Sequence, residues 1–236
     1  SRRGDVDRSF RHPRAAHRYE TICFVTRYAQ LERHALADTM LAVGPDAPTL
    51  CSPWRVRDLA AHLILRETRP DLAAGMFVPR LAARLDRAQE KVAEGDFAEL
   101  VDKVRNGPPR WTAAAVPAVD EAMNRMEFFV HHEDVLRANT DAPHRALDTE
   151  LAKAVWSGLT RSAGLLYRRA PVGVILVADG VGRQVVRRPS GSGSAVVRGP
   201  VADIVMYSYG RTGAVSVKVT GPQAAVAALT AAQLSI

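Results

Sequence analysis

Cysteine is scarce in this sequence, since 236 residues contain only Cys23 and Cys51. Two such cysteines provide neither a disulfide framework nor a CxxC redox or metal motif. No apolar run approaches the roughly 20 residues of a membrane-spanning helix, and no signal-peptide core is present. These absences predict a cytoplasmic protein that does not associate with a membrane.

The sequence motifs of several enzyme classes are also missing. We find no phosphate-binding P-loop, no glycine-rich dinucleotide fingerprint and no Ser-His-Asp arrangement. Kinase, dehydrogenase and serine-hydrolase functions are therefore unsupported.

The charge is basic, with a net charge of +7, and its distribution matters more than its size. Residues 1–20 hold six arginines and three acidic residues, which leaves a net charge of +4 for the other 216 residues. Within 161–198 there are seven arginines and the single acid Asp179. No recognition-helix, RNP or zinc-finger pattern accompanies these charges, so we expect an anionic small molecule rather than nucleic acid as the partner.

Residues 1–143 are expected to form a tail followed by a helical domain. Residues 1–20 have no apolar periodicity and are expected to be a disordered leader, or sequence upstream of the true start. The segment 21–143 is expected to form an up-down four-helix bundle, because proline- and glycine-containing connections separate its helical patterns. The expected helices are Ile22–Val43, Trp54–Thr68, a helix within Val78–Val104 that breaks near Gly95 and Asp96, and Glu121–Asn139.

Residues 144–236 predict a small α+β domain. Valine-rich segments separated by glycine-rich turns are typical of strands, and proline near a first turn is typical of helix starts. The expected strands lie at 172–179, 183–188, 194–198 and 214–220, and the expected helices at Leu147–Arg169, Pro200–Tyr209 and Pro222–Leu234.

The stretch Arg125–Asp134, RMEFFVHHED, carries the strongest chemical signal. At helical spacing Glu127, His131 and Asp134 fall inside or beside an apolar stripe, whereas Glu121, Arg125 and His132 point toward solvent. That expected stripe consists of Met123, Met126, Val130 and Leu136. Because Glu127 and His131 are four residues apart, they can converge on one divalent metal ion, or they can simply hydrogen-bond to each other or to a buried water.

A second imidazole is expected to face inward from another helix. His62 lies on the same helical face as Leu59, Leu63 and Arg66. His34 and His144 have no partner at a suitable spacing, and Trp54 and Trp111 are expected to be packing anchors.

Two motifs together resemble a known family. W-x-V-x-D-L-A-A-H at 54–62 and E-x-x-x-H-x-x-D-V at 127–135 resemble the mycothiol-dependent maleylpyruvate isomerase-like proteins of the DinB-like metal-binding superfamily. The segment GPDAPTLCSPW and the pattern V-R-G-P…Y-G-R…V-T-G-P are similar to an uncharacterised branch of that group. The resemblance covers about 21–234, and its motifs indicate the superfamily better than the reaction.

The resemblance implies a site and a chemistry. Its metal ligands would be His62, Glu127 and His131, with Zn²⁺ as the expected ion and mycothiol as the expected thiol cosubstrate. Arg211 would hold an acidic substrate. Asp134 would orient a metal ligand, cap a neighbouring helix or pair with Arg66, and these alternatives stay open. Cys51 precedes the helix of His62, and we expect it to be a small buried apolar residue.

The expected function is that of an isomerase or thiol S-transferase in which a metal-activated thiolate attacks an anionic electrophile. A non-catalytic metal-binding or ligand-sensing protein on the same fold is the alternative, because a fold does not dictate a function.

Overall fold

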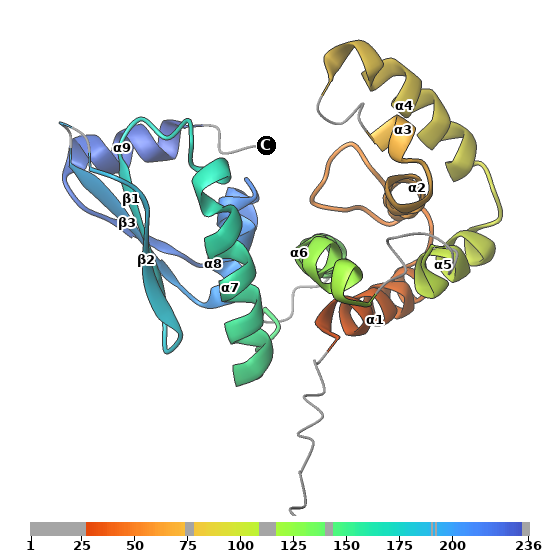
Figure 1. Cartoon of the computed structure of the whole chain (residues 1–236), viewed down its shortest axis with the longest axis horizontal. Coiled ribbons are helices and arrows are strands. Elements are labelled where there is room, and N and C mark those ends of the chain that lie inside the picture. The colour runs from red at the N-terminus through yellow and green to blue at the C-terminus, as the bar shows by residue number, and fades with distance from the viewer. Residues whose placement is uncertain are drawn as a thin grey trace, which may run out of the picture.

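The computed structural model describes residues 27–73, 78–108, 117–139, 144–189, 191 and 193–232. The predictions for the tail at 1–20, for Cys23 and for Trp111 lie outside these residues. Within the described part of the chain, a mostly helical half is followed by a half that contains a small mixed sheet (Figure 1). The fold class predicted from the sequence is confirmed.

Local signals mark the ends of the helices in the helical half. Gly44 follows the first helix with a φ of 87°, and Asp58 accepts a hydrogen bond of 2.8 Å from the N–H of Arg55 at the start of the second. The predicted break near Gly95 is confirmed, because Asp96 there caps a separate helix. The helices are α1 (Tyr28–Val43), α2 (Val56–Thr68), α3 (Pro70–Ala73), α4 (Pro79–Ala93), α5 (Phe97–Asn106) and α6 (Pro117–Asn139).

The second half surrounds a four-stranded sheet in the order β2-β1-β3-β4. Strand β1 pairs antiparallel with β2 and parallel with β3, and β3 pairs antiparallel with β4. The fourth strand is shorter than predicted: it covers only Lys218–Thr220, while Ala214 ends a 3-10 helix and 215–217 form neither helix nor strand. The elements are α7 (Thr149–Leu166), β1 (Gly173–Ala178), β2 (Gly182–Arg187), β3 (Ser194–Gly199), α8 (Val201–Ser208), η3 (Thr212–Ala214), β4 (Lys218–Thr220) and α9 (Gln223–Ala231).

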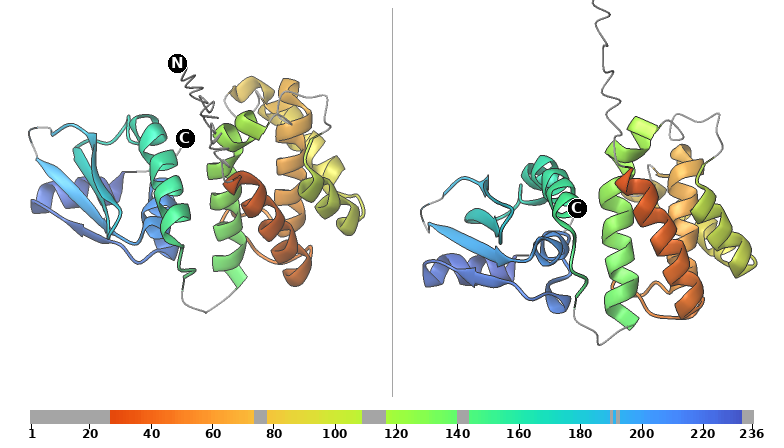
Figure 2. Two further views of the ribbon diagram at one scale, coloured as in Figure 1. Left: turned by 60° about the horizontal axis from the view of Figure 1, so that its bottom comes forward. Right: turned by 90° about the horizontal axis from the view of Figure 1, so that it is seen from below.

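Helix α6 lies on the side of the helical half that faces the other half, as the ribbon views show (Figures 1 and 2). Phe128 belongs to the core of the helical bundle, whereas its neighbour Phe129 belongs to the core of the sheet-containing half. Helix α6 therefore packs apolar residues on two sides. The prediction of a single apolar stripe is wrong in part. Met123, which was assigned to that stripe, has 58% of its surface exposed.

No helix in the part of the chain that the structure describes is long and apolar enough to cross a membrane.

Candidate metal centre

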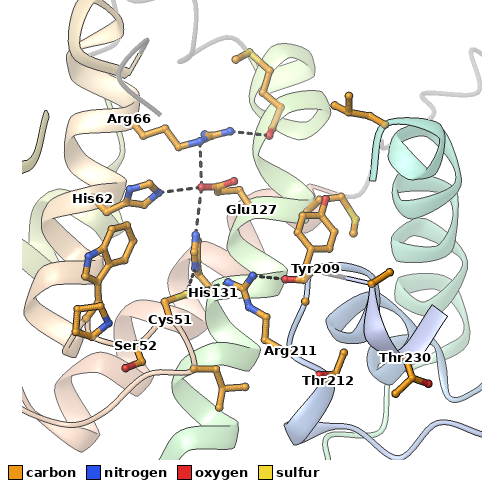
Figure 3. Close-up of a pocket in the computed structure, with 18 of the residues that line it drawn as sticks. Cys51, Ser52, His62, Arg66, Glu127, His131, Tyr209, Arg211, Thr212 and Thr230 are labelled. Carbon is orange, nitrogen blue, oxygen red and sulfur yellow. Dashed lines mark hydrogen bonds and ion pairs between the residues drawn. The ribbon is translucent and has the colours of Figure 1, made fainter. Parts of the chain in front are cut away.

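A cavity of about 1150 Å³ opens between the two halves of the molecule (Figure 3). The helical half contributes α2, α6 and the loop before α2, and the other half contributes α7 and the segments around η3 and α9. The lining residues are Leu50, Cys51, Ser52, Pro53, Trp54, His62, Arg66, Met123, Met126, Glu127, His131, Leu165, Tyr209, Gly210, Arg211, Thr212, Thr230, Ala231 and Ala232.

The structure brings His62, Glu127 and His131 together on one wall of this cavity. The Nε2 atoms of His62 and His131 each lie 3.3 Å from the same oxygen, Oε1 of Glu127. Helix α2 supplies the first imidazole, while one turn of α6 supplies the carboxylate and the second imidazole. One ligand atom from each of the three residues lies within 4.8 Å of the others.

These three side chains fit a divalent metal ion. A tetrahedral ion with bonds of about 2.0–2.1 Å separates neighbouring ligand atoms by about 3.4 Å. The two separations of 3.3 Å between imidazole nitrogen and carboxylate oxygen agree with that spacing. Two histidines and one glutamate that leave coordination positions free are also the donor set of catalytic zinc sites.

His131 is held by a carboxylate on the far side of its ring. Its Nδ1 lies 3.0 Å from Oδ2 of Asp134, which is fully buried. A metal-ligating histidine commonly donates its other ring N–H in this way, which sets the orientation of the imidazole. Of the three roles left open for Asp134, the structure therefore favours the one that orients His131. Arg66 pairs with Glu127 instead, at 3.1 Å.

Cys51 is not the apolar residue that was predicted. Its thiol is half-buried and donates a hydrogen bond of 2.9 Å to Asp134, while Nη2 of Arg211 donates to the sulfur at 2.9 Å. Cys51, His131 and Asp134 form a second cluster with metal-ligand spacing. Because the Arg211 guanidinium already contacts both Asp134 oxygens and the sulfur, a second cation there would be repelled. This cluster is therefore a hydrogen-bond network that adjoins the group of His62, Glu127 and His131.

His132 faces away from His131, but the prediction that it points toward solvent is wrong. Its Nδ1 lies 3.0 Å from Oε2 of Glu32, and its Nε2 lies 3.0 Å from the hydroxyl of Thr39. Helix α1 covers that side of α6 and supplies both partners. His144, which among the described residues has no partner at a suitable spacing for a metal site, lies apart from this cluster with its Nδ1 2.8 Å from Asp203. Trp54 packs against the bundle core, and its ring centre lies 4.9 Å from that of His62.

The surroundings shift the pKa values of His62 and His131 in opposite directions. Burial lowers the pKa of His62 below its usual value. Burial acts in the same direction on His131, but hydrogen bonds to Asp134, Cys51 and Glu127 outweigh it and hold its pKa well above the usual value. For Glu127 burial acts to raise the pKa, yet hydrogen bonds from His131 and His62 keep it well below the usual value. At neutral pH the metal-free site therefore holds neutral His62, ionised Glu127 and protonated His131.

Binding of a divalent ion at neutral pH should release about one proton, because the ion needs both imidazoles unprotonated. The proton comes from His131, whose pKa is raised, and not from His62, whose pKa is lowered. The apparent affinity should rise with pH until the pH exceeds the pKa of His131, and should fall more steeply in acid, where His62 also takes up a proton. Calorimetry in buffers of different ionisation enthalpy measures the number of protons released when the ion binds. Release of no proton at neutral pH would contradict the assignment.

No protein-family model and no curated protein matches this chain. Among solved structures, the fold is similar to that of a mycothiol-dependent maleylpyruvate isomerase, with a TM-score of 0.56 and 17% sequence identity over 83% of this chain and 91% of that one. A variant of that isomerase with one histidine replaced by alanine gives a TM-score of 0.57 at 16% identity, with the same coverage. The resemblance stated from the sequence is therefore confirmed at the level of the fold.

Proposed function

We propose that this protein binds one divalent metal ion, most naturally Zn²⁺, through His62, Glu127 and His131, and that it uses the ion in thiol chemistry. The observation that carries the proposal is the convergence of both imidazole Nε2 atoms on one carboxylate oxygen, in the wall of a large cavity. Structural ions are usually closed off by four protein ligands, whereas three ligands beside a cavity leave room for a small molecule.

The proposed reaction is an isomerisation or an S-transfer that depends on a small thiol. A bound divalent ion would lower the pKa of a coordinated thiol, so that thiolate is available at neutral pH. The sulfur would then bond to an electrophilic carbon. In an isomerisation the π bond would break as its electron pair moves onto a conjugated carbonyl group, and after rotation about the resulting single bond the pair would return and expel the thiolate. In a transfer a leaving group would depart with its bonding electron pair instead. The names of the structural neighbours support mycothiol as the thiol.

The residues around the ion have separate tasks in this proposal. Asp134 holds His131 in the orientation that presents Nε2 to the cavity. Arg66 and Arg211 make the lining basic, which favours an anionic electrophile. The cavity of about 1150 Å³ exceeds the 300–1,000 Å³ typical of a single small-ligand pocket, so it has room for a thiol and an electrophile together.

Titration of a small thiol into the Co²⁺-loaded protein tests this function. Mycothiol should produce the sulfur-to-cobalt charge-transfer absorption, because its sulfur reaches a free coordination position. An S-methylated thiol should not produce it, since it cannot form a thiolate. Absence of the absorption at millimolar thiol, with cobalt demonstrably bound, would remove the thiol mechanism. The non-catalytic metal-binding or ligand-sensing function would then be the better description.

A further inference from the structure

Arg66 and Arg211 both line the cavity. They differ in how many of their guanidinium N–H groups already donate hydrogen bonds within the protein. Arg211 forms a two-pronged pair with Asp134, in which Nε donates at 2.9 Å and Nη2 donates at 2.8 Å. Its Nη2 also donates to Cys51, and its Nη1 donates to the carbonyl of Tyr209 at 2.6 Å. Among the residues that the structure describes, four of the five N–H groups of this guanidinium are therefore engaged.

Arg66 has one engaged donor fewer, and its bond from Nη2 is long. Its Nη1 donates at 2.6 Å to Oδ1 of Asn124, and its Nη2 makes only a long contact of 3.4 Å with the carbonyl of Met123. Its Nε forms the ion pair with Glu127. Within the described part of the chain, one N–H on each Nη atom has no partner, and the guanidinium lines the cavity. Arg66 thus presents two free donors, whereas Arg211 presents one.

A buried network holds Arg66 in this position. The amide nitrogen of Asn124 donates to Glu67 at 2.9 Å and to Asp120 at 2.7 Å, which leaves its oxygen to accept from Arg66. Both of these carboxylates also pair with Arg33 of α1, which is almost fully buried. The orientation of the Asn124 amide is therefore set by two acids on one side and by Arg66 on the other.

We infer that Arg66, and not Arg211, is the residue that binds the carboxylate of the anionic electrophile. Arg211 instead positions Asp134, and through it His131. A guanidinium held in place beforehand binds a carboxylate with little loss of side-chain entropy. Arg66 also touches Glu127, so an anion bound to it lies beside the metal ligands (Figure 3). The chemical class of this ligand rests on the proposed function.

Succinate, a dicarboxylate without an electrophilic carbon, is the probe that tests this inference. Its binding to the full-length protein is measured by calorimetry, both without metal and with Zn²⁺ bound. Arg66→Gln should weaken binding by about tenfold or more in both states, because a charge-assisted hydrogen bond is lost. Arg211→Gln should change it by less than about threefold, since most of its donors already serve Asp134 and Cys51.

Two further variants separate anion binding from a structural role. Arg69→Gln removes the same charge near the end of the same helix, but Arg69 pairs with Asp71 at the surface, so succinate binding should be unchanged. Arg66→Lys keeps the charge and should recover part of the affinity, which a purely structural role would not predict. Arg66→Gln with wild-type affinity, a larger loss in Arg211→Gln, or no succinate binding by the wild type would each overturn the inference.

The succinate experiment and the cobalt titration can fail independently of each other. If the cobalt titration fails while succinate binding still depends on Arg66, the anion site stands and the thiol mechanism falls. If the cobalt absorption appears while Arg66→Gln binds succinate as the wild type does, only the assignment of Arg66 falls.

Discussion

Replacement of His131 by alanine should abolish stoichiometric binding of a divalent ion, while replacement of its neighbour His132 should not. His131→Ala removes one of three donors, and loss of a group that merely supports a ligand already costs about 10–100-fold in metal affinity. Glu127→Gln, which keeps the shape of the side chain and removes its charge, should have a comparable effect. Elemental analysis and competition with a chromophoric chelator give the stoichiometry and the affinity.

His132→Ala is the matched control, because its ring lies on the other side of α6 against Glu32 and Thr39. It should bind metal as the wild type does, but should lower the free energy of unfolding by about 1–3 kcal/mol, since a buried carboxylate loses one of its partners. Arg145 still pairs with Glu32 in this variant. Metal loss in His132→Ala together with full metal binding in His131→Ala would show that the wrong face of α6 has been assigned to the site.

Replacement of Arg137 by alanine should lower the free energy of unfolding by about 3–5 kcal/mol. This side chain is almost fully buried, with Nε 2.7 Å from Glu133 and Nη1 2.5 Å from Asp203. It also donates to the carbonyl of Ala214 at 2.8 Å, so it joins α6 to the half that carries Arg211. The large effect is expected because one buried cation is lost from two buried carboxylates at once, while their remaining ion-pair partners, Arg145 for Glu133 and His144 for Asp203, are more exposed. Urea unfolding followed by circular dichroism measures the change.

Arg105→Ala provides the comparison for Arg137→Ala. Arg105 forms an equally short ion pair with Asp38, at 2.6 Å, but that carboxylate is mostly exposed. An ion pair that is open to water should contribute less than about 1 kcal/mol. Equal effects of the two substitutions would mean that burial of the Arg137 network is not what makes it stabilising.

The local features of the fold were predictable from the sequence because they depend on near neighbours in the chain. The interruption between α4 and α5 is marked by Gly95 and by Asp96, which caps the next helix. The prolines at 200 and 222 immediately precede α8 and α9. A helix repeats every 3.6 residues, so the convergence of Glu127 and His131 follows from their spacing of four.

The sequence by itself therefore determined most of the succession of helices and strands, apart from the short α3 and η3, and it placed a carboxylate and an imidazole on one turn of α6. Only the tertiary structure decided which distant groups meet them. The contact of His132 with Glu32 spans 100 positions, that of Cys51 with Asp134 spans 83 positions, and that of Arg211 with Asp134 spans 77 positions. Periodicity reports which side of a helix is apolar, but α6 is covered on both sides, and a polar side chain can be buried wherever a remote partner satisfies it.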